Sequence, residues 1–230
     1  MTTPEPGGHA ATPPSLGPSV RAQILATEHW SLLATRSMTW SEVMSRIVIH
    51  LTVISASLVV LALIAQANGF GRAFWVLSIS LAGAALLLGT LTGLRVHNAS
   101  ADDMAMLLGM NRLRSAYIDL DPFIEPYLVT SRHDDPAGLM ASYLMGNRRS
   151  TFSHVVASTG MFINVVNGLV AGTLGALLAA AADAPPWLIV MIGSASGLAY
   201  IGAAVGIFSR MFRGSRIRSR FPTPDAPIGG

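Results

Sequence analysis

The sequence contains no cysteine and no lysine, and it has few charged residues of any kind. Without cysteine, the chain has no disulfide bond, no thiolate zinc site and no cysteine nucleophile. All 15 basic side chains are arginine, which together with the many Ala, Gly and Pro residues favours a high-GC bacterial genome. Charged residues make up 12% of the chain, against roughly 25% in soluble domains. Much of the chain is therefore expected to lie in a solvent other than water.

Apolar residues make up 51% of the 230 residues and are concentrated in four blocks. Each block has at least about 20 residues, the length that crosses a hydrocarbon core at a rise of 1.5 Å per residue. The four predicted spans cover residues 47–66, 74–94, 155–181 and 187–208. We therefore predict an all-α fold, a four-helix transmembrane bundle made of two hairpins, with amphipathic helices on the cytoplasmic side.

Polar segments flank and separate the two hairpins. Residues 1–18 are rich in proline and lack the basic start and apolar run of a signal peptide, so they are predicted to be disordered. The full predicted organisation is a disordered tail (1–18), an amphipathic cytoplasmic helix (19–45), a transmembrane hairpin (46–94), a cytoplasmic helical segment (95–151), a second transmembrane hairpin (152–209) and a basic, disordered tail (210–230).

Two capping-box patterns predict where helices begin, since a Ser or Thr three positions before an acidic residue satisfies the first backbone N–H groups. Thr39 with Glu42 predicts the start of the helix that enters the membrane. Ser100 with Asp103 predicts the start of a cytoplasmic helix. Further expected landmarks are a helix end or kink at Pro122 and Pro126 and a short helix at residues 139–144.

The distribution of arginine predicts the orientation in the membrane. Of the 15 arginines, only Arg72 lies in the two turns assigned to the far side. Because loops rich in arginine stay in the cytoplasm, we expect both termini to be cytoplasmic, with the protein in a bacterial inner membrane.

Pairs of glycines four residues apart recur within the spans. Such pairs expose backbone on one face of a helix, so that another helix can approach closely. They fit either an interface between copies in a homo-oligomer or packing within one protomer. The pairs are Gly89/Gly93, Gly168/Gly172, Gly193/Gly197 and Gly202/Gly206.

The polar residues at membrane depth are uncharged. Asn164 and Asn167 share one helix face, and amides in hydrocarbon need partners or water. They are interpreted either as interhelical hydrogen-bonding groups or as the lining of a pore. The absence of Asp, Glu and Arg near the centre of any span argues against ion-coupled transport. His50 and His154, near the interface, are the ionisable candidates.

Two cytoplasmic features could bind partners. An apolar helix face with adaptable methionines suits the docking of a protein partner, or packing against the preceding amphipathic helix; its residues are Met106, Met110, Leu113 and Tyr117. The C-terminal tail carries five arginines that should attract anionic lipid headgroups of the bilayer rather than nucleic acid. These are Arg210, Arg213, Arg216, Arg218 and Arg220.

The sequence carries no catalytic signature. We find no phosphate-binding glycine loop, no zinc-protease helix and no serine nucleophile elbow. The stretch around His133, Asp134 and Asp135 has no recognisable spacing of metal ligands and is interpreted as a solvated loop. We therefore predict a protein that is not an enzyme, with no catalytic residues, cofactor or metal.

Two stretches carry a resemblance to known proteins: residues 28–33 (EHWSLL) with Arg46, and residues 110–117 (MNRLRSAY). They resemble a group of bacterial integral membrane proteins of four spans to which no activity is assigned, over residues 28 to 209. The layout of the first half is also similar to the SLATT-type two-span effector domains, which implies pore formation. Two functional hypotheses follow. The first is a small oligomeric membrane protein that forms or regulates a permeation path. The second is a non-catalytic membrane scaffold that recruits a cytoplasmic partner.

Overall fold

The computed structural model describes residues 16–145, 157–214 and 219–224, without the side chains of residues 211–214. Throughout these ranges the regular structure is helical. Four helices are long and apolar enough to cross a membrane, as expected of a multi-pass membrane protein. They are α1 (Pro18–Asn68), α2 (Arg72–Leu120), α5 (Thr159–Ala181) and α6 (Pro186–Gly214).

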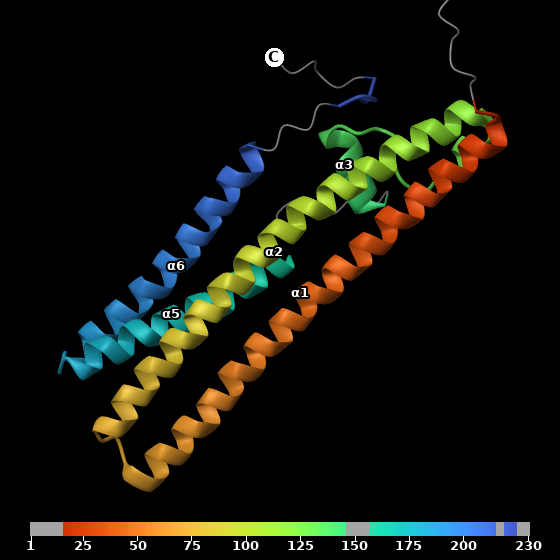
Figure 1. Ribbon diagram of the computed structural model, residues 1–230. Coiled ribbons are helices and arrows are strands. Elements are labelled where there is room, and N and C mark those ends of the chain that lie inside the picture. Colours follow the sequence, from red (N-terminus) through yellow and green to blue (C-terminus); the bar gives the residue numbers. More distant parts are fainter. Residues whose placement is uncertain (1–15, 146–156, 215–218, 225–230) are drawn as a thin grey trace, which may run out of the picture.

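The two longest helices, α1 and α2, lie side by side and are joined by a short turn (Figure 1). Gly69 in this turn has a φ of 63°, a conformation that costs glycine little. Helix α5 packs across α2, and α6 packs on α5. The α1–α2 and α5–α6 turns lie toward one end of the molecule. The 3-10 helix η1 (Pro122–Tyr127) and the short helix α3 (Pro136–Leu144) lie at the other.

Helices α1 and α2 are far longer than a membrane requires. With 51 and 49 residues, each extends for roughly 75 Å, against a hydrocarbon core of about 30 Å. The part of the pair beyond the apolar blocks therefore forms a two-helix stalk. Residues 19–45, predicted as a separate helix, belong to the same continuous helix as the first span.

The prediction that helices begin at the two capping boxes is wrong, because Thr39 and Ser100 both lie in helix interiors. The acidic residues of these patterns make tertiary contacts instead. Glu42 pairs with Arg46 at 2.8 Å and with Arg95 of α2 at 2.7 Å. Asp103 pairs with Arg36 of α1. The end of α2 before Pro122 and the short helix α3 agree with the predicted landmarks.

Asp103 is the centre of a buried polar network in the stalk. Its side chain is 3% exposed and accepts hydrogen bonds from Arg36 Nε at 2.5 Å, Trp40 Nε1 at 2.8 Å and the Tyr143 hydroxyl at 2.8 Å. Burial alone would raise the pKa of Asp103, but these three donors outweigh burial and lower it. The network thus joins α1, α2 and α3 through a single carboxylate.

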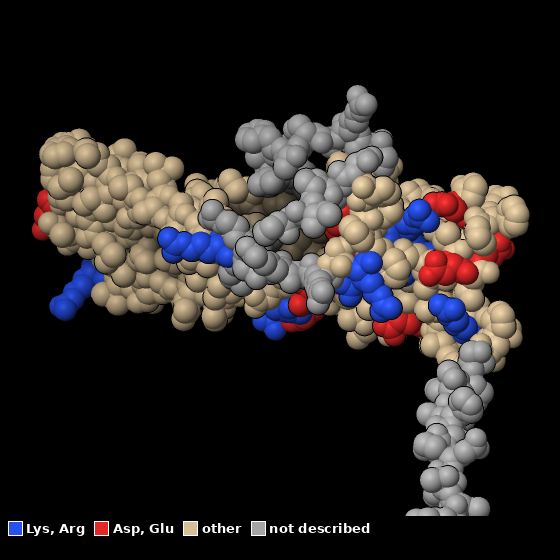
Figure 2. All heavy atoms as spheres, turned by 90° about the horizontal axis from the view of Figure 1, so that it is seen from above, with Lys and Arg blue, Asp and Glu red and all other residues tan. Residues whose placement is uncertain are grey.

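Charged residues gather at the stalk. Figure 2 shows most Arg, Asp and Glu side chains over the end that holds α3 and η1, while the rest of the visible face carries few. We call this the charged end. Such a division is the one that a bilayer imposes, because ionised side chains are costly inside hydrocarbon.

Helices α5 and α6 approach each other closely at four of the predicted packing glycines. A Cβ built on Gly197 would lie 2.8 Å from the carbonyl oxygen of Gly168, and one on Gly172 would lie 2.9 Å from that of Gly193. The pairs Gly168/Gly172 and Gly193/Gly197 therefore allow two helices of the same protomer to pack closely. Gly202, in contrast, has open space where a Cβ would be, and so does Gly206.

Candidate functional site

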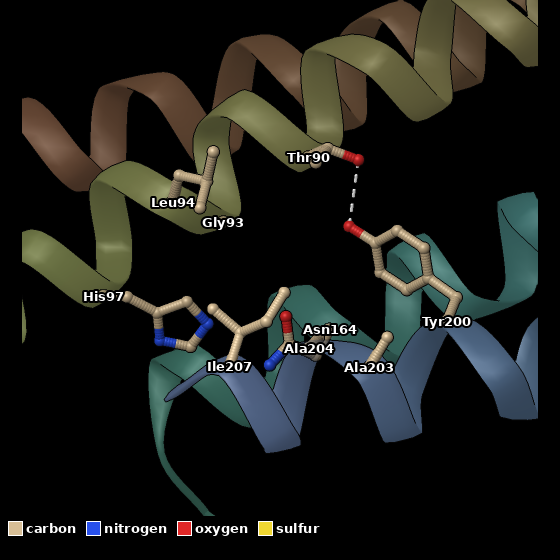
Figure 3. Close-up of a pocket in the computed structure, with 9 residues that line it drawn as sticks. All are labelled: Thr90, Gly93, Leu94, His97, Asn164, Tyr200, Ala203, Ala204 and Ile207. Atoms are coloured by element: carbon tan, nitrogen blue, oxygen red, sulfur yellow. Dashed lines mark hydrogen bonds between the residues drawn. The ribbon is translucent and has the colours of Figure 1, made fainter. Parts of the chain in front are cut away.

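A chain of polar side chains links all four membrane helices near the charged end of the apolar region. His50 Nε2 of α1 lies 3.1 Å from Asn167 Oδ1 of α5. Asn167 Nδ2 donates to the Tyr200 hydroxyl of α6 at 3.2 Å. The Tyr200 hydroxyl lies 3.0 Å from Thr90 Oγ1 of α2 (Figure 3). His50 and Asn167 are 1% and 0% exposed.

These hydrogen bonds run in one direction. The Thr90 hydroxyl donates to the Leu86 carbonyl at 2.7 Å, so it accepts from Tyr200. Tyr200 in turn accepts from the Asn167 amide, whose oxygen is left to accept from His50 in its Nε2–H tautomer. Each bond polarises the next in a low-dielectric interior. The chain therefore fixes the relative positions of the four helices.

Gly89 makes room for this chain. A Cβ at Gly89 would overlap the Asn167 amide oxygen and the His50 ring. At Gly93, one turn later, a Cβ would meet Asn167 and Asn164 at ordinary contact distance. The predicted pair Gly89/Gly93 thus faces the polar residues of α5, and a larger residue than glycine would not fit at position 89.

Beside the chain lies a cavity of about 110 Å³ between α2, α5 and α6. Its polar lining consists of Thr90, His97, Asn164 and Tyr200, and its remaining lining is apolar. The His97 ring and the Asn164 amide lie side by side at its edge (Figure 3).

His97 gives the cavity its chemical character. The side chain is buried and packs on Phe208, with ring centroids 4.4 Å apart. The Asn164 side chain lies close enough to interact with the ring, although neither ring nitrogen has a hydrogen-bond partner of ordinary geometry within the described ranges. A buried polar atom without a partner is costly unless water reaches it. The nitrogens themselves are almost inaccessible, so the cavity borders the His97 side chain rather than its nitrogens.

The structure brings Asn164 and Asn167 into this one site and adds residues that sequence reasoning missed. These are Thr90, His97 and Tyr200. His97 follows a predicted span by three positions, which is a local signal that could have been noticed. Tyr200 shows its role only when α6 is placed beside α5. His154, the other predicted histidine, lies outside the described residues.

The methionine face does not form a free docking surface. Met106 and Met110 are 8% and 3% exposed, because this part of α2 lies between α1 and the segment that includes α3. Leu113 and Tyr117 are half-buried, and the Tyr117 ring stacks on His29 of α1. The prediction of packing against the preceding helix fits this arrangement, and the prediction of a docking surface does not.

The C-terminal tail is only partly as predicted. Arg210 is exposed near the end of α6, as lipid contact would require. The side chain of Arg213, together with Arg216 and Arg218, lies outside the described residues. Residues 219–224 were predicted to be disordered, yet they bind Asp134 and Asp135, which are buried rather than solvated. The physical reason is a set of hydrogen bonds that is described below.

No cluster of three metal-ligating side chains occurs in the part of the chain that the structure describes. Comparisons with protein-family models, with curated proteins and with solved structures found no match to this chain. The resemblance to four-span bacterial membrane proteins and to SLATT-type domains therefore stays a prediction.

Proposed function

We propose that the protein forms or regulates a permeation path across a bacterial inner membrane, as a small homo-oligomer with both termini in the cytoplasm. The observation that carries the proposal is the cavity of about 110 Å³ among the apolar helices, whose lining includes Thr90, His97, Asn164 and Tyr200. It lies beside a hydrogen-bonded chain that links four helices. Hydrocarbon offers polar groups no partner, so the polar part of this lining supports a path for water and small polar solutes.

The chemistry of the lining narrows the class of permeant. Imidazole, amide and hydroxyl groups exchange hydrogen bonds with water, and among the described residues no carboxylate or guanidinium lines the cavity. A site of this kind does not hold a fixed counter-charge for a metal cation. Protons, water and small uncharged polar solutes are the permeants that fit. Anionic lipid at the arginine-rich tail would hold the charged end at the cytoplasmic leaflet.

Filling the cavity should reduce permeation without breaking the fold. We expect Asn164→Leu to lower proton and small-solute flux in liposomes that contain the purified oligomer, because leucine removes the amide from the lining. The hydrogen-bonded chain through Asn167 should remain, since Asn164 is outside it. Flux assays with a pH-sensitive dye and an osmotic swelling assay would measure the change.

Thr173→Leu is the matched control, because Thr173 lies on α5 but is exposed and donates to the Leu169 carbonyl. Equal flux from wild type, Asn164→Leu and Thr173→Leu would contradict the assignment of the cavity. A folded oligomer that shows no flux at all would contradict the permeation proposal. The scaffold alternative would need a contact surface other than Met106 and Met110, which are buried within the protomer.

A further inference from the structure

The buried carboxylate of Asp134 accepts hydrogen bonds from a C-terminal segment of the same chain. The Ser219 hydroxyl donates to Oδ1 at 2.7 Å, and the backbone N–H groups of Arg220 and Phe221 donate at 2.9 and 2.7 Å. Asp134 N donates back to the Phe221 carbonyl at 3.2 Å. Arg112 of α2 holds the second carboxylate oxygen at 2.6 Å. Burial alone would raise the pKa of Asp134, but this set of donors lowers it strongly.

Asp135 extends the same contact. Its carboxylate accepts from Thr223 N at 2.7 Å and from the Thr223 hydroxyl at 3.1 Å. It also caps α3 by accepting from Gly138 N at 2.7 Å. Two neighbouring carboxylates therefore bind residues 219–224, chiefly through their backbone. We call Asp134 and Asp135 the cradle and residues 219–224 the tail segment.

The cradle is fixed to α2. Asn111, which is fully buried, donates to the His133 carbonyl at 2.7 Å, and Ser115 donates to the Arg132 carbonyl at 2.7 Å. The loop that carries the cradle thus moves with α2. A segment bound to the cradle is tied to α2 as well.

The tail segment limits how far the end of α6 can lie from the cradle, because α6 ends at Gly214 and only four residues precede Ser219. Five residue steps span at most roughly 18 Å. Helix α6 packs mainly on α5, and among the described residues it also has side-chain contacts with α2. They include the Tyr200–Thr90 hydrogen bond and the Phe208–His97 ring contact. The cavity lies between these two helices.

We propose that the tail segment is an autoinhibitory latch, which holds the charged end of α6 against α2 and keeps the cavity narrow. The predicted change in flux through the cavity rests on the function proposed above. The predicted change in the position of α6 does not rest on it. Release of the tail segment from the cradle lets α6 move away from α2 at Phe208 and widens the cavity beside His97.

Asp134→Asn is the variant that tests the latch most directly. Both carboxylate oxygens of Asp134 accept hydrogen bonds, whereas asparagine must place its NH2 group, which cannot accept, against one of these donors. Truncation after Arg218 removes the tail segment and leaves the cradle intact, so it covers the case in which the substituted cradle fails to fold. Asp119→Asn is the control, since this carboxylate is exposed on α2.

The native chain has no cysteine, so two introduced cysteines, Ala101→Cys on α2 and Arg210→Cys on α6, can carry spin labels. We expect the distance between the labels to lengthen and broaden in Asp134→Asn and in the truncated chain, but not in Asp119→Asn. We also expect several-fold higher flux in the two released forms.

An unchanged distance in both released forms would overturn the latch whatever the flux does. If the distance lengthens in the released forms but their flux stays at the wild-type level, the inhibitory role of the latch would be overturned. If no form shows flux but the distance lengthens, the latch stands and the permeation proposal fails.

Discussion

Replacing Asp103 with alanine should destabilise the stalk by about 3 kcal/mol, because the change leaves charged and polar groups without their common partner. Removal of one member of a buried ion pair costs ~3–5 kcal/mol, and the lower end applies since the Arg36 side chain is 33% exposed. The Trp40 indole and the Tyr143 hydroxyl also lose their acceptor. Unfolding by heat or denaturant in detergent micelles, followed by tryptophan fluorescence, measures the loss. Trp40 reports on it directly.

Glu42→Ala is the control for this prediction. Glu42 also pairs with two arginines, but its side chain is 42% exposed and salt screens such pairs. We expect its effect to be a small fraction of that of Asp103→Ala. Comparable losses for the two variants would show that Asp103 acts as an ordinary surface carboxylate.

The same network predicts how stability depends on pH. The pKa of Asp103 is lower in the folded protein than its unfolded value of about 3.9. The contribution of this carboxylate is therefore complete above about pH 4 and is lost as the pH falls through the folded pKa. We expect the difference between wild type and Asp103→Ala to stay constant from neutral pH to about pH 5 and to shrink in stronger acid.

The four apolar helices could be predicted from the sequence because span length and hydrophobicity are local properties. The sequence could not predict that α1 and α2 are each continuous, because Glu42 and Asp103 fit two structural roles. Each fits a capping box three residues after a Ser or Thr, and each can also pair with an arginine far away in the sequence. Only the packing of α1 against α2 selects the second role.

The candidate site was predictable only in part for the same reason. Asn164 and Asn167 stood out because amides are costly in hydrocarbon. Tyr200 and His97 became part of the site through the crossing of α5 with α2 and the packing of α6 on α5. The cradle was missed because its ligands are backbone N–H groups 86 and 87 residues further along the chain, and the sequence carries no pattern for backbone donors.

Stalk, cavity and tail segment together suggest how one sequence could couple the charged end to the membrane. The cavity is bounded by α2, which is continuous with the stalk, and by α6, which leads to the tail segment. In the latch that we propose, a change at the cradle reaches the cavity by releasing α6, while the cradle itself stays with α2. This arrangement makes the contact between α5 and α6 decisive, since it must hold while α6 moves.

Gly197→Val should therefore have the other large effect. A Cβ at Gly197 would lie 2.8 Å from the Gly168 carbonyl oxygen, and this neighbour is backbone that cannot rotate away. Overpacking of this kind costs ~1–3 kcal/mol where side chains can adjust, so we expect a loss of about 3 kcal/mol here. The two helices would be forced apart, and Tyr200, one turn further along α6, would lose its hydrogen bonds with Asn167 and Thr90.

Gly202→Val on the same helix is the matched control. It replaces a glycine by the same β-branched residue, but at a position where the new side chain meets open space. Thermal unfolding in micelles and size-exclusion chromatography with light scattering should separate the two variants. We expect Gly197→Val to unfold at a lower temperature and Gly202→Val to match wild type. Equal loss of stability in both would show that helix propensity, not close packing, decides the outcome. A loss of oligomer in Gly202→Val alone would place the contact between copies on the open face of α6.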